Sequence, residues 1–178
     1  LLPFMIWLAG EPLLARNPEP GLRWLAENGS STLPLSGILV RKSMRRLCDT
    51  GDAAKVNQAV EFLAGILEKD ARLTLAALDG LIEGQQARPL APTADTKPLF
   101  AKLNASDNAE VKSRARQLGA LWSDPSAMEL TLKLVSDASA PAADRIAAIQ
   151  TARSFKSDAA RETLLKLVLC TQLDLPVQ

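Results

Sequence analysis

The sequence of 178 residues predicts an all-α protein, an α-α superhelix of about five stacked antiparallel helix hairpins. Three observations predict this fold. Apolar residues recur at helical spacing along almost the whole chain, with no convincing period of two that would indicate strands. Most of the eleven prolines stand where a helix would begin. The first helices of successive hairpins start near residues 2, 35, 71, 109 and 142, and such a period in an all-helical chain is typical of stacked repeats.

Apolar stripes define the helices one after another. Val56, Val60, Leu63 and Leu67, for example, lie about one helical turn apart and would form one buried face. Short polar turns join most of the segments, which favours antiparallel neighbours. The helices are expected at residues 2–14, 19–27, 34–49, 53–68, 71–84, 96–104, 108–122, 125–137, 141–154 and 158–172.

Start signals agree with these ranges. Pro34 and Pro125 occupy the first position of a predicted helix, where proline costs no hydrogen bond. Asp52 and Asp158 are predicted N-caps, and residues 107–110 are similar to a capping box that begins at Asp107.

We expect residues 1–178 to form a single repeat domain that belongs to a larger multidomain protein, since the chain begins on Leu1 within an apolar pattern. The longest connection is the Pro- and Ala-rich segment 85–95, which we expect to be either a protruding loop or a hinge.

The repeats resemble a known family. Residues 129–135 and 162–168 share Glu, Leu, Lys, Leu and Val at a step of 33. Residues 109–121, followed by Ser123, Asp124 and Pro125, resemble a HEAT repeat of the armadillo-like class, and residues 70–81 do so more weakly. The resemblance implies a non-catalytic solenoid that presents extended surfaces to other proteins. The tetratricopeptide signature is missing, and the chain has no Tyr.

A second resemblance concerns residues 3–13, which are similar to a segment in the helical-repeat region of large bacterial membrane-bound dehydrogenase-type, haem-binding proteins. In that family a β-propeller precedes the helical repeats and a cytochrome c-type domain follows them. The resemblance implies a periplasmic or exported parent oxidoreductase. No redox residue can be carried over to this chain, which lacks a Cys-x-x-Cys-His motif.

The amino-acid composition argues against several common kinds of catalytic, metal and nucleic-acid-binding site in this segment. The chain has no His, which removes Ser-His-Asp and Cys-His catalysis and His-ligated metal sites. Cys48 and Cys170 are too far apart in sequence for a zinc or haem motif. The formal net charge is only +1, although a domain that binds nucleic acid is usually far more basic. We therefore expect no catalytic residue, cofactor or metal in this segment.

The candidate interaction residues are Trp7, Arg41, Lys42, Arg45 and Arg46. The four cations follow helical spacing and would share one strip, which suits a phosphate, an acidic partner or a membrane surface. The alternative is a solvated face near the negative end of a helix dipole. Trp7 is a candidate contact for an upstream domain, the alternative being packing against Trp24 and Leu25 in its own hairpin.

One carboxylate pair, Asp79 and Glu83, stands at helical spacing as a general acid and base would, but nothing else in the sequence supports catalysis. The function expected is a non-catalytic scaffold that docks flanking domains of the parent chain or another protein. The alternative is a HEAT-like nucleic-acid-binding or DNA-processing module, although nucleic acid is not the expected partner. The apolar start is too short to span a membrane, and no transmembrane segment is expected.

Overall fold

The structure is a computed structural model that describes residues 2–86, 88–155 and 157–169. These residues form ten α-helices and no strand, so the prediction of an all-α fold is confirmed. The helices are α1 (Leu2–Arg16), α2 (Pro18–Asn28), α3 (Pro34–Asp49), α4 (Ala53–Ile66), α5 (Ala71–Gln85), α6 (Lys97–Ala105), α7 (Ala109–Leu121), α8 (Pro125–Ser136), α9 (Ala142–Ala152) and α10 (Asp158–Leu169).

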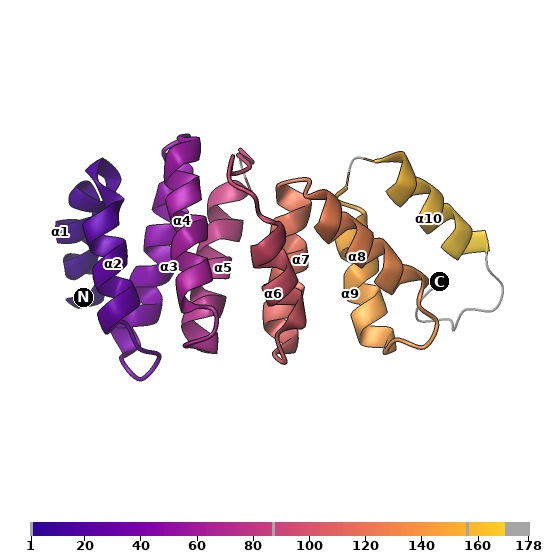
Figure 1. The fold of residues 1–178 in the computed structure, drawn as a ribbon, viewed down its shortest axis with the longest axis horizontal. Coiled ribbons are helices and arrows are strands. Elements are labelled where there is room, and N and C mark those ends of the chain that lie inside the picture. The colour runs from indigo at the N-terminus through magenta and orange to yellow at the C-terminus, as the bar shows by residue number, and fades with distance from the viewer. Residues whose placement is uncertain (1, 87, 156, 170–178) are drawn as a thin grey trace.

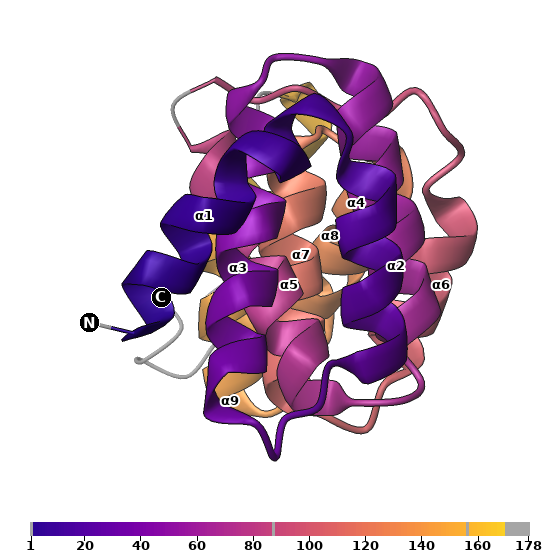
Figure 2. The same ribbon diagram turned by 90° about the vertical axis from the view of Figure 1, so that its left-hand side faces the viewer.

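The helices stack in sequence order along the long axis of the molecule (Figure 1). In one layer α1 packs on α3, α3 on α5, α5 on α7 and α7 on α9. In the other layer α2 packs on α4, α6 on α8, and α8 on α10. The end-on view separates α1, α3 and α5 from α2, α4 and α6 (Figure 2). This arrangement is consistent with the stacked hairpins expected from the sequence period.

Local signals explain where the helices begin. Pro18, Pro34 and Pro125 each occupy the first helical turn, as predicted for the latter two. The Asp52 carboxylate accepts a hydrogen bond from the amide of Ala54 and caps α4, which confirms a predicted N-cap.

Two predicted caps are displaced by one residue. The N-cap of α7 is Asn108, whose side-chain oxygen accepts from the amides of Glu110 and Val111, and Asp107 lies outside the helix. At α10 the Ser157 hydroxyl accepts from the amide of Ala160, while Asp158 is already helical. In α7 and α10 the cap is therefore the side chain whose oxygen reaches the second or third amide.

The closest packing joins α3 to α5. Gly80 and Gly84 lie one turn apart on α5 and both face α3. A Cβ at Gly84 would stand 2.6 Å from the Cβ of Cys48 and 2.8 Å from the carbonyl oxygen of Arg45. The absence of side chains at both glycines lets the two helix backbones approach closely.

The apolar core consists of two clusters. The larger cluster is continuous from Leu14 in α1 to Trp122 at the end of α7, and the smaller one runs from Ala120 to Leu167. The larger cluster continues without a break from α5 to α6, although a long connection joins these two helices. The boundary between the two clusters lies instead where α7 turns into α8.

The long connection after α5 is held to its neighbours. The fully buried Gln85 side chain accepts from the amide of Leu90 at 2.5 Å and donates to the Leu90 carbonyl at 3.0 Å. Asn57 of α4 bonds Thr93 through both its amide nitrogen and its oxygen. These contacts fix residues 90 and 93 against the helices, and a hinge at residues 85–95 stays a prediction.

No helix within the described ranges is both long enough and apolar enough to cross a membrane.

Candidate functional site

The five candidate interaction residues meet in one place. Trp7 of α1 and Arg41, Lys42, Arg45 and Arg46 of α3 line a shallow groove of about 640 Å³, which we call the α1–α3 groove. Leu8 and Ile38 add apolar surface to it, and Glu11, Asp49 and Glu83 add three carboxylates.

The helical spacing of the cations explains their alignment. Arg41 and Lys42 are followed one turn later by Arg45 and Arg46, so the four side chains form one strip along α3. Packing of α1 on α3 then brings Trp7 to the edge of this strip.

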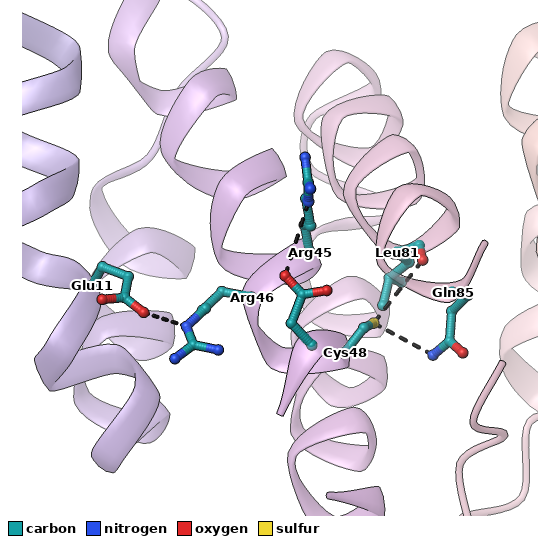
Figure 3. Close-up of polar contacts among 7 residues, drawn as sticks. Glu11, Arg45, Arg46, Cys48, Leu81 and Gln85 are labelled. Carbon is teal, nitrogen blue, oxygen red and sulfur yellow. Dashed lines mark hydrogen bonds and ion pairs between the residues drawn. The ribbon is translucent and has the colours of Figure 1, made fainter. Parts of the chain in front are cut away.

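Two of the arginines are occupied by carboxylates of neighbouring helices. Arg46 donates to Glu11 of α1 (Figure 3), and Arg41 donates to Glu83 of α5. The hydrogen bond from Arg41 lowers the pKa of Glu83 below its usual range. These two pairs connect α3 to the helix on either side of it.

The other two cations have weaker partners. The ammonium of Lys42 lies 5.5 Å from the centre of the Trp7 ring, a cation–π distance. The guanidinium of Arg45 lies 3.9 Å from the carboxylate of Asp49 on its own helix. Neither Lys42 nor Arg45 donates a hydrogen bond to a carboxylate among the residues that the structure describes.

The charges of the groove nearly balance. Four cations against the three carboxylates of Glu11, Asp49 and Glu83 leave a net charge of +1. A surface that follows a nucleic-acid backbone needs several phosphate-binding cations without carboxylates between them. The groove therefore lacks an uninterrupted set of cations, and the absence of a nucleic-acid partner stays a prediction.

The Asp79 and Glu83 pair has a structural explanation. Asp79 accepts from Arg114 of α7 at 2.6 Å, while Glu83 accepts from Arg41 of α3. One turn of α5 thus carries a carboxylate for each of its two neighbours in the layer.

The sequence contains a signal for two ion pairs between neighbouring helices, which spacing within a single helix does not reveal. Glu11 and Arg46 are 35 residues apart, as are Asp79 and Arg114. That separation falls within the range of the repeat period, so each pair occupies matching helices of successive hairpins. Opposite charges one period apart are the pattern that would have predicted them.

Trp7 also borders a second, apolar hollow. This hollow of about 250 Å³ lies among α1, α2 and α3 and is lined by Trp7, Trp24, Leu13 and Leu39 among others. The half-buried ring shares this hollow with Trp24 and also faces Lys42 in the α1–α3 groove. A contact of Trp7 with an upstream domain stays a prediction.

Trp122 belongs to the core. It is buried and meets Phe100 edge-to-face, with ring centres 6.0 Å apart and an interplanar angle of 75°.

The surroundings of the Cys48 thiol are those of a buried structural cysteine. Burial raises its pKa to about 11, although a hydrogen bond from Gln85 acts in the opposite direction. The thiol also lies near the Leu81 carbonyl (Figure 3). Cys170 lies outside the described residues. Within those residues no group of three His, Cys, Asp or Glu side chains is placed to hold a metal ion.

Arg145 of α9 is a second feature that the sequence did not single out. It is buried and directs its guanidinium to the carbonyl of Val135 at 3.5 Å, in the last turn of α8. A cation in this place complements the negative end of the helix, so Arg145 has a structural role in joining α8 to α9.

Comparisons of the chain with family models, with curated proteins and with solved structures found no match. The likeness to HEAT repeats and to the dehydrogenase-type proteins accordingly rests on the residues quoted above.

Proposed function

We propose that this chain is a non-catalytic, HEAT-like scaffold that docks other protein domains, and that α1 provides the docking surface. The observation that carries the proposal is the uncovered apolar face of α1. Phe4, Met5, Ile6, Leu8 and Leu13 are 39–69% exposed although all five are large apolar residues on one helix.

Helix composition supports this proposal. A helix that is apolar on all sides is normally buried, because a helix at a protein surface is usually apolar on one side only. α1 contains two charged residues, Glu11 and Arg16, in 15 positions. Its inner side packs on α3 through residues such as Trp7 and Leu14, and its outer side has no covering element among the described residues.

The logic of solenoids leads to the same proposal. Each repeat contacts only its neighbours, and a face that no neighbouring repeat covers needs to be polar to stay soluble without a partner. The outer side of α1 does not have this polarity. Contiguous apolar surface of this kind marks a protein interaction site.

Co-purification with the flanking domains of the same reading frame, followed by native mass spectrometry, tests the proposal. We expect a stable complex that the double change Met5→Glu and Leu13→Glu abolishes. Leu130→Glu on α8 is the matched control, because Leu130 is also an exposed leucine on a helix. A protein that contacts none of these domains, or a complex that the α1 changes leave intact, would overturn the proposal.

The parent protein is part of the same proposal. Residues 3–13 support placing the repeats in a larger exported bacterial oxidoreductase, in which they would join a propeller to a haem domain. The full reading frame decides this point. A propeller upstream and a Cys-x-x-Cys-His motif downstream would support it, whereas an isolated short gene would contradict it and favour the nucleic-acid alternative.

A further inference from the structure

The α1–α3 groove contains two cations whose binding capacity is largely unused. Arg41 and Arg46, at the two ends of the strip, already donate to Glu83 and Glu11. Lys42 and Arg45 lie between them and are three residues apart, so their charged groups project from adjacent turns of α3. Two cations in this relation can donate to the two oxygens of one carboxylate.

Apolar side chains flank this pair of cations. Ile38 precedes Lys42 by one turn and is exposed, Leu8 of α1 is exposed, and the Trp7 ring lies beside Lys42. A ligand that placed a carboxylate between the two cations would bring its neighbouring groups onto this apolar surface. An acidic residue next to a large apolar residue satisfies both requirements.

We propose that the α1–α3 groove binds an acidic segment of a partner protein, with an Asp or Glu between Lys42 and Arg45 and an apolar side chain against Trp7, Leu8 and Ile38. This inference rests on the proposed docking function and names its partner chemistry.

Charge complementarity selects a peptide over a polyphosphate. The carboxylates of Glu11, Asp49 and Glu83 line the same groove and would repel a chain of phosphates at several points. A single carboxylate needs only the local positive charge of Lys42 and Arg45. The apolar flanks would also gain nothing from a phosphate backbone, whereas they would bury the side chain of a peptide.

Fluorescence anisotropy with labelled synthetic peptides tests the proposal on the whole chain. The probe peptide carries one Glu next to a Leu in an otherwise uncharged sequence, and the comparison peptide has Gln in place of this Glu. We expect the Glu peptide to bind at least about tenfold more tightly, and its affinity to fall as salt rises, since exposed charges are screened. Equal affinity for the two peptides, or no binding of the Glu peptide, would overturn the proposal.

Variants locate the site. Lys42→Glu with Arg45→Glu should remove binding of the Glu peptide, and Lys42→Gln with Arg45→Gln should weaken it with less risk to the fold, which circular dichroism checks. Lys133→Glu is the matched control, because Lys133 is exposed on α8, away from the groove. Unchanged binding by a folded Lys42 and Arg45 variant would contradict the proposal.

Two further arms separate this inference from its alternatives. A labelled DNA duplex that bound more tightly than the Glu peptide, through the same two cations, would identify a nucleic-acid site and overturn the peptide proposal. A complex with flanking domains that depends on Met5 and Leu13 but not on Lys42 and Arg45 would leave the docking function standing while the acidic-segment proposal fails.

Discussion

Gly80 of α5 lies directly on Met44 of α3, so closely that a Cβ on Gly80 would stand 2.9 Å from the Cβ of Met44. The same atom would come closer still to the carbonyl oxygen of Arg41. Since Met44 is fully buried and the Arg41 carbonyl is part of a helix, neither group can move aside alone. The spacing of α3 and α5 therefore depends on this glycine.

Gly80→Ala should push α3 and α5 apart. Overpacking in a well-packed interior typically costs about 1–3 kcal/mol of unfolding free energy. Urea denaturation followed by circular dichroism measures the change.

Gly65→Ala on α4 is the control for helix propensity. Nothing lies within 4 Å of a Cβ at that position, so alanine should stabilise the protein by about 0.5–1 kcal/mol. Equal effects at the two positions would show that the close approach at Gly80 is not important.

Most of the helices could be predicted because their signals are local. Pro34 and Asp52 set the starts of α3 and α4 through contacts within one turn, and the described bounds of these helices begin where the sequence indicated. The displaced caps at Asn108 and Ser157 have the same origin. Two neighbouring residues each carry an eligible oxygen, and only the final backbone path decides which of them reaches the amides.

The groove could be predicted only in part. The strip from Arg41 to Arg46 followed from helical spacing, but the meeting of this strip with Trp7 depends on how α1 packs on α3. The carboxylate partners Glu11 and Glu83 are 35 and 42 residues away in sequence. Such contacts are set by the stacking of repeats, which propensities and local spacing do not determine.

Gln85 anchors the connection between α5 and α6. Gln85→Ala would remove both hydrogen bonds to Leu90 and leave the partly buried amide and carbonyl of Leu90 without these partners. Unsatisfied buried polar groups cost about 1–3 kcal/mol each, so we expect local opening of residues 88–96. Hydrogen exchange at these residues should become faster in the variant.

Gln86→Ala provides the comparison, since Gln86 is the exposed residue next in the chain. Faster exchange after both changes would indicate a general weakening at the end of α5, and unchanged exchange after Gln85→Ala would show that the anchor is unimportant.

Asp124 should make stability depend on pH. Burial raises the pKa of its carboxyl, but hydrogen bonds from Ser126, Thr96 and the amide of Ala127 outweigh burial and leave the pKa below its ordinary value of 3.8. The ionised carboxylate therefore stabilises the fold above that value, and this contribution disappears as pH falls through the lower pKa of the folded state.

Asp124→Asn keeps the cap of α8 but removes the charge. Unfolding free energies measured from acidic to neutral pH should differ most between the variant and the unmutated protein near neutral pH. The two curves should converge below about pH 4. Asp107→Asn is the control, because Asp107 is adjacent to a helix start without capping it. Parallel curves of unfolding free energy against pH for the unmutated protein and the Asp124 variant would rule out this carboxylate as a source of the pH dependence.

Cys48 should react only when the protein opens. Its pKa is raised to about 11 by burial between α3 and α5, so at pH 8 almost none of the thiol is present as the reactive thiolate. In a Cys170→Ser variant, which leaves Cys48 as the one thiol of the sequence, iodoacetamide should label the native protein far more slowly than the protein in urea. Mass spectrometry follows the reaction.

Gly80→Ala, which is expected to separate the same two helices, should accelerate labelling in native buffer, whereas Gly65→Ala should not. Rapid labelling of the folded Cys170→Ser protein with Gly80 unchanged would show that the α3–α5 contact opens readily. It would also show that the close packing at Gly80 contributes little to stability.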